Sequence, residues 1–155
     1  MPTASSSVKW GRQPRSSLAL LQSSKGLAAV EARSGRVAWN YTDGASTIPS
    51  ATVSDGVVFV PSHGITALEP AADGNSPRQL WRSGQLRPAT ASPVILNRRV
   101  FTLNEAGVLS CGDATNGVRL WQLRLKGPFS ATPVAAGSLL YCVNEKGLLQ
   151  VVDTT

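Results

Sequence analysis

The chain has 155 residues, of which 42% are hydrophobic and only 15% are charged. This length is sufficient for one domain with a buried core, and the composition excludes a disordered chain and a long solvated helix. The net charge is +6, but the basic residues are scattered and do not alternate with aromatic residues, so no nucleic-acid partner is expected.

In chain order, residues 1–10 are expected to form a flexible lead-in or a closing strand, and short apolar runs separated by turn residues then follow up to residue 155. These runs repeat, with corresponding positions 38 to 43 residues apart. The corresponding positions are a glycine before an apolar strand (Gly26, Gly64, Gly107, Gly147), an aromatic residue (Phe59, Phe101, Tyr141) and a tryptophan (Trp39, Trp81, Trp121). A repeat of about 40 residues with four short strands is typical of a propeller blade.

The sequence therefore predicts an all-β fold, a partial β-propeller of about four four-stranded blades, over residues 11–155. The first blade is expected to be degraded, because it lacks most of the pattern of its innermost strand. The predicted units are about 11–39, 49–81, 91–121 and an incomplete unit at 131–155.

The unit resembles the pyrroloquinoline quinone (PQQ)-like propeller repeat, whose tryptophan-docking motif is A-x-D-x-x-x-G-x-x-x-W. The segments AVEARSGRVAW and CGDATNGVRLW follow this spacing, and ALEPAADGNSPRQLW has four extra residues in its turn. The candidate docking residues are Glu31, Gly35, Trp39, Glu69, Trp81, Asp113, Gly117 and Trp121. We expect each tryptophan to pack against the neighbouring blade, each glycine to permit the turn, and each acid to accept hydrogen bonds from turn amides.

The resemblance implies two alternative functions. Family members that bind PQQ oxidise alcohols or sugars with a catalytic aspartate, calcium ligands and often a disulfide between adjacent cysteines, and none of these can be matched in this chain. The other branch resembles the lipoprotein of the outer-membrane barrel-assembly machinery. We therefore expect a non-catalytic protein-binding or assembly scaffold, with no cofactor and no metal site. The alternative is a fragment of a PQQ-dependent alcohol or sugar dehydrogenase.

A protein or peptide partner is expected on one face of the propeller. The turns between the second and third strands and the loops after each tryptophan strand should share that face. The candidate partner-binding residues are Arg82, Arg87, Glu105, Arg124, Lys126 and Glu145. An ordinary solvated loop face is the alternative reading for each of them. His63 is interpreted as a turn residue, because no serine, cysteine or aspartate completes a catalytic group with it.

Two cysteines, Cys111 and Cys142, could form one disulfide, but the pattern favours two small buried residues on strands. Family resemblance implies an extracytoplasmic or cell-envelope location. The sequence itself shows no apolar run of membrane-spanning length and no secretory signal peptide.

At the C-terminus, Asp153 aligns with Asp113, so a docking motif begins there without its glycine and tryptophan. The preferred explanation is a truncated gene or a piece of a longer propeller. The alternative is that Trp10 belongs to a strand that completes the last blade. In that case further blades from a second chain would close a ring of eight.

Overall fold

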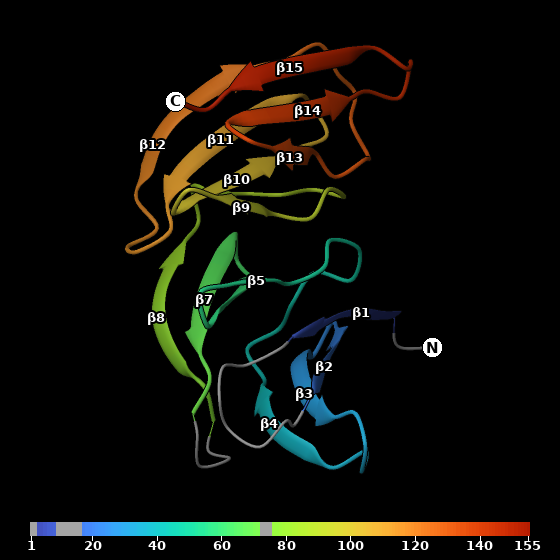
Figure 1. Cartoon of the computed structure of the whole chain (residues 1–155), viewed down its shortest axis with the longest axis vertical. Helices are drawn as coiled ribbons and strands as arrows, with labels where there is room; N and C mark the ends of the chain where they lie inside the picture. The colour runs from blue at the N-terminus through green and yellow to red at the C-terminus, as the bar shows by residue number, and fades with distance from the viewer. Residues whose placement is uncertain (1–2, 9–16, 72–75) are drawn as a thin grey trace.

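The computed structural model describes residues 3–8, 17–71 and 76–155, and their strands form four antiparallel sheets arranged along a curve (Figure 1). This arrangement confirms the predicted all-β fold and partial propeller. Each sheet is one blade, and the strands lie side by side in chain order. No helix in the described part of the chain is long and apolar enough to cross a membrane.

The strands have the following bounds. Blade 1 comprises β1 (Thr3–Val8), β2 (Leu18–Ser23), β3 (Gly26–Glu31) and β4 (Val37–Tyr41). Blade 2 comprises β5 (Thr52–Ser54), β6 (Val57–Pro61), β7 (Ile65–Glu69) and β8 (Arg78–Ser83). Blade 3 comprises β9 (Val94–Leu96), β10 (Arg99–Leu103), β11 (Val108–Asp113) and β12 (Arg119–Arg124). Blade 4 comprises β13 (Val134–Ala136), β14 (Leu139–Val143) and β15 (Leu149–Asp153).

The first blade differs from the others at β1. This strand pairs with β2, and the pairing shifts register between Ala4 and Ser7, whereas β5, β9 and β13 pair with their neighbours without a shift. Trp10, the candidate for a closing strand, lies outside the described residues.

Short strands β5, β9 and β13 lie on the inner side of the curve, and β8 and β12 lie on its outer side (Figure 1). Just before these inner strands, one residue from each of blades 2, 3 and 4 takes part in a chain of hydrogen bonds. The Ser50 amide donates to the Ser92 hydroxyl at 2.9 Å, and the Ser92 amide donates to the Thr132 hydroxyl at 2.9 Å. The Ser/Thr that opens a repeat unit therefore joins it to the preceding blade.

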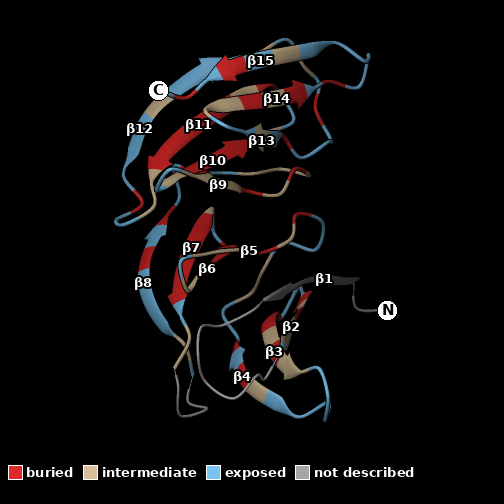
Figure 2. Cartoon of the chain, viewed as in Figure 1, coloured by how far each residue is buried: buried red, intermediate tan, exposed pale blue. Residues whose placement is uncertain are grey.

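The hydrophobic core lies between successive blades, where the buried strand segments face one another (Figure 2). Blades 1 and 2 share a cluster that includes Leu20, Val58 and Leu68. Full burial of each such side chain stabilises the folded chain by about 1.5–3 kcal/mol. Because these side chains are buried between blades, a blade is stable mainly through contact with its neighbours. Cys111 and Cys142 are free and buried in the cluster between blades 3 and 4.

The outer strand pair of each complete blade contains the same irregularity. A small residue on the third strand pairs with the tryptophan on the fourth, and the register then shifts by a bulge. The pairs are Ala29 with Trp39, Ala67 with Trp81 and Cys111 with Trp121. A bulge bends and twists the strand locally, and its repetition gives the three tryptophans equivalent places in their blades.

Candidate functional site

The Trp81 side chain of blade 2 packs on the docking turn of blade 3. Its ring lies so close to Gly117 that an added Cβ there would be 2.4 Å from Trp81 Cε3. Its indole Nε1 donates a hydrogen bond to the carbonyl oxygen of Ala114 at 3.0 Å. The turn of one docking motif thus receives the tryptophan of the preceding blade.

The acids of the docking motifs organise their own turns. The Thr115 hydroxyl and amide donate to Asp113 Oδ1 at 2.5 and 2.7 Å, and these bonds hold the pKa of the Asp113 carboxyl below its usual value. The pKa of Glu31 is lowered first by its bond from Arg36 and then by the Ser34 hydroxyl. The acid therefore accepts a turn amide in blade 3 and side-chain donors in blade 1.

Trp39 and Trp121 have different environments from Trp81. Trp39 is 4% exposed, but its Nε1 has no hydrogen-bond partner among the described residues. The docking turn of blade 2 includes residues 72–75, which lie outside the described residues. Trp121 is half-buried and its ring centroid lies 5.9 Å from that of Phe101, much as Trp81 lies beside Phe59 in blade 2.

The structure brings the two predicted sets of loops together on one face. The Leu125 amide donates to the Gly107 carbonyl at 2.8 Å, and Asn144 Nδ2 donates to the Lys126 carbonyl at 2.8 Å. The β12–β13 loop is therefore bonded to the hairpin turns of blades 3 and 4. We call this surface the loop face, and it comprises residues 24–25, 42–51, 62–64, 84–93, 104–107, 125–133 and 144–148.

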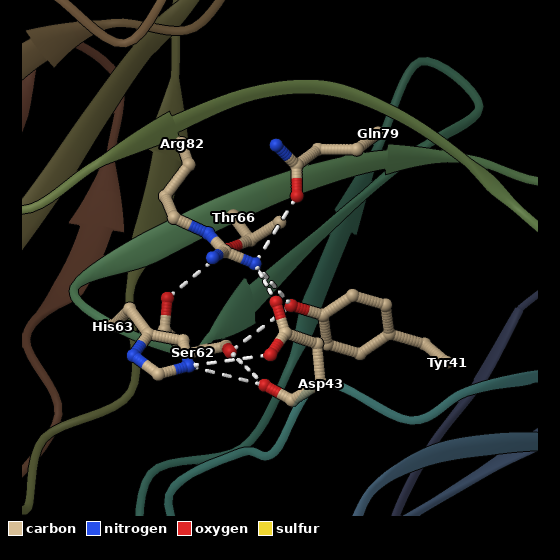
Figure 3. Close-up of polar contacts among 7 residues, drawn as sticks. All are labelled: Tyr41, Asp43, Ser62, His63, Thr66, Gln79 and Arg82. Carbon is tan, nitrogen blue, oxygen red and sulfur yellow. Dashed lines mark hydrogen bonds and ion pairs between the residues drawn. The ribbon is translucent and has the colours of Figure 1, made fainter.

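The predicted partner-binding residues divide into two groups in the structure. The residues exposed in the loops of the loop face are Arg87, Glu105, Lys126 and Glu145. Arg124 is exposed at the end of β12, next to this face. Arg82 on β8 is also exposed, but its guanidinium forms hydrogen bonds within the chain (Figure 3).

A polar network holds Arg82 in place. Its guanidinium donates to the Asp43 carboxylate, to Tyr41 OH at 3.0 Å and to Thr66 Oγ1 at 3.1 Å. The Arg82 hydrogen bond lowers the pKa of Asp43, and the same bond raises the pKa of Arg82. The network ties the β4–β5 loop to β7 and β8, so Arg82 is less available to a partner than the sequence suggests.

Sequence reasoning did not identify Asp43, which lies in a connecting loop outside the repeat pattern. The backbone carbonyl of Asp43 is 3.2 Å from Nε2 of His63, and its carboxylate Oδ1 is 3.6 Å from the same nitrogen (Figure 3). His63 has a φ of 53° in the β6–β7 turn, where it is exposed. This placement agrees with its interpretation as a turn residue.

Among the described residues, cavities open on opposite faces of the blades. One, of about 310 Å³, lies on the loop face and is lined by Ser46, His63, Gly64, Arg87 and Pro88. The other, of about 330 Å³, lies between blades 2 and 3 at their far ends, where Phe59, Leu80, Ile95 and Arg98 are among its lining residues. In the described part of the chain, no group of three or more His, Cys, Asp or Glu residues is placed to hold a metal ion.

Comparison with known proteins decides the family. The model of the family described as outer membrane protein assembly factor BamB matches residues 65–155. The chain belongs to this BamB family. No curated protein matches the sequence closely enough to count as a relative.

Solved structures show the same fold. BamB from Moraxella catarrhalis is 24% identical with a TM-score of 0.64, and the match covers 88% of this chain and 46% of that chain. The computationally designed protein Ika4 is 12% identical with a TM-score of 0.73, covering 89% of this chain and 86% of that chain. A quinohemoprotein alcohol dehydrogenase from Pseudomonas putida HK5 is 17% identical with a TM-score of 0.63, covering 83% of this chain and 27% of that chain.

This BamB-family chain thus spans less than half of the Moraxella catarrhalis structure. The segment that matches the BamB family model runs from β7 to the end of the chain, so it includes the contact of Trp81 with Gly117. It also includes three loops and turns of the loop face in blades 3 and 4, with Glu105, Lys126 and Glu145.

Proposed function

We propose that this chain is a non-catalytic protein-binding scaffold that acts in outer-membrane protein assembly, in the cell envelope, and that its loop face holds the partner. The supporting observation is the construction of that face. Hydrogen bonds join the β12–β13 loop to hairpin turns of the two blades that it connects, through Leu125 to Gly107 in blade 3 and through Pro128 to Glu145 in blade 4. A surface already ordered before binding loses less conformational entropy when a partner arrives.

The charges of the loop face suit a protein partner. Arg87, Glu105, Lys126 and Glu145 are exposed there and form no ion pair among the described residues. Exposed charges of both signs select partners and raise the association rate by electrostatic complementarity. Several blades contribute them, so the binding energy would be distributed over neighbouring loops.

The second candidate is a fragment of a PQQ-dependent dehydrogenase, and the likeness in fold to the Pseudomonas putida enzyme supports it. Reconstitution of the chain with PQQ and calcium, followed by dye reduction with an alcohol or a sugar, separates the two candidates. The scaffold proposal expects dye reduction equal to a buffer control. Turnover above that control would favour the dehydrogenase.

Binding to an assembly substrate tests the scaffold directly. An outer-membrane barrel protein, unfolded in urea and labelled with a fluorophore, is diluted into the purified chain, and its anisotropy is measured. We expect saturable binding that weakens about tenfold or more in the double variant Arg124→Glu, Lys126→Glu, because charge reversal introduces repulsion. The matched control, Arg33→Glu with Arg119→Glu, changes the charge equally at the opposite ends of the blades.

The control variant should bind as the unchanged chain does. Lack of binding by the unchanged chain contradicts the proposed scaffold function. Equal weakening in both double variants contradicts the assignment to the loop face.

A further inference from the structure

The cavity on the loop face lies where three successive connections meet. Ser46 comes from the β4–β5 loop, His63 and Gly64 from the β6–β7 turn, and Arg87 and Pro88 from the β8–β9 loop. Its volume of about 310 Å³ is at the lower end of the range for ligand pockets, about 300–1,000 Å³. A single side chain of a bound peptide suits this size better than a large cofactor.

The walls of this cavity are held by backbone contacts. The Ser46 amide donates to the Pro61 carbonyl at 2.7 Å. Gly64 has a φ of 102° and approaches Ser83 so closely that an added Cβ would lie 2.2 Å from its carbonyl oxygen. The pocket therefore exists before any ligand binds.

Arg87 gives the cavity a positive charge. Its Nε donates to the Gly84 carbonyl at 2.7 Å, which orients the guanidinium and leaves its two terminal nitrogens without a hydrogen bond among the described residues. The described residues that line the cavity include no acidic residue. The Asp43 carboxylate lies beside His63, but its negative charge is paired with the Arg82 guanidinium.

His63 adds a second polar group. The Nε2 atom faces the Asp43 carbonyl, so this nitrogen carries the proton that the carbonyl accepts (Figure 3). The other ring nitrogen, Nδ1, points away from the network (Figure 3). In the neutral ring that nitrogen is a hydrogen-bond acceptor, which suits a backbone amide of a peptide.

We propose that this pocket binds the side-chain carboxylate of an acidic residue in a peptide segment of the partner. The inference rests on the proposed protein-binding function and names the chemistry that the loop face recognises. A guanidinium forms two parallel hydrogen bonds with a carboxylate, and both terminal nitrogens of Arg87 are available for them. One guanidinium matches an anion with a single charge.

Amide NMR on the full chain tests the proposal with blocked pentapeptides that contain one central glutamate. We expect saturable shifts at Ser46, Gly64 and Gly84, and about tenfold weaker binding of the matched peptides with central glutamine, because they lack the charge. The Arg87→Gln variant should lose the preference for glutamate. Lys25→Gln, which removes a charge from another loop of the same face, should keep it. The amide spectrum of each variant shows whether its fold is intact.

Equal shifts with both peptides, or an unchanged preference in Arg87→Gln, would overturn the proposal. A third matched peptide carries a central phosphoserine, and tighter binding of this peptide than of the glutamate peptide would overturn the carboxylate assignment. The two proposals fail separately. Binding of the unfolded barrel protein without pocket shifts contradicts only the pocket, and pocket shifts without binding of that protein contradict only the scaffold function.

Discussion

The Leu125 carbonyl lies so close to Gly107 that no side chain fits between them. An added Cβ at Gly107 would be 2.6 Å from the Leu125 oxygen, and its φ of 87° is a conformation that other residues rarely adopt. Gly26 and Gly64 make the same approach to the carbonyls of Tyr41 and Ser83. This contact explains why a glycine recurs before the third strand of a blade.

Replacement of Gly107 by alanine should lower the free energy of unfolding by about 1–3 kcal/mol, through backbone strain and the collision with Leu125. Gly137 is a matched control, because it also has a positive φ, of 60°, but an added Cβ meets no atom within 4 Å. Gly137→Ala should therefore cost about 1 kcal/mol. Urea denaturation measures both, and equal losses would contradict the steric explanation.

The buried thiol of Cys142 makes the free energy of unfolding depend on pH in the alkaline range. Burial raises its pKa from 9.0 to about 11. Between these values the unfolded chain loses the thiol proton while the folded chain retains it, so the free energy of unfolding falls as pH rises. Below about pH 9 both states are protonated and the stabilisation is fully present.

We expect urea denaturation at pH values from 8 to 11 to show this fall, and to show a smaller fall for Cys142→Ala. The alanine variant lacks the thiol but keeps the other groups that titrate in this range. Parallel profiles for the two proteins would contradict a raised pKa at Cys142.

At the scale of elements, the tryptophan on the outer strand connects one blade to the next. Trp81 has both parts of this contact, the ring on Gly117 and the indole bond to Ala114. Trp121 is half-buried, and its indole makes no hydrogen bond among the described residues. The two equivalent positions should therefore contribute differently to stability.

Trp81→Ala should cost about 3–5 kcal/mol, the usual range for removing a large buried aromatic side chain. Trp121→Ala should cost less, because part of its ring is already exposed to water. Urea melts of both variants give the comparison. An equal loss of unfolding free energy in the two variants would contradict a larger contribution from the contact between blades 2 and 3.

The repeat predicted the elements well, because spacing within a unit sets which strand each residue occupies. It could not show that Gly117 receives Trp81, since that contact joins two units. The hydrogen bonds of Ser50, Ser92 and Thr132 had a visible signal, because these residues lie 42 and 40 residues apart before the inner strands. Asp43 had no such signal, because a connecting loop outside the repeat carries no periodicity.

At the scale of the whole molecule, the core between blades and the bonded loops support the same surface. Blades 1 to 4 are held to their neighbours by shared core clusters, and the connecting loops lie on one face with the turns between second and third strands. The proposed scaffold function depends on which face of the propeller meets the partner.

Site-specific photo-crosslinking tests this dependence most directly. A photoreactive amino acid replaces Lys126 or Ser46 on the loop face, or Thr115 or Ser34 in the turns at the opposite ends of the blades. Each protein is mixed with the unfolded outer-membrane barrel protein and irradiated. Covalent adducts from Lys126 and Ser46, with none from Thr115 and Ser34, are the predicted result. Adducts from the opposite turns alone, equal adducts from all four positions, or no adducts would contradict a scaffold that binds its partner through the loop face.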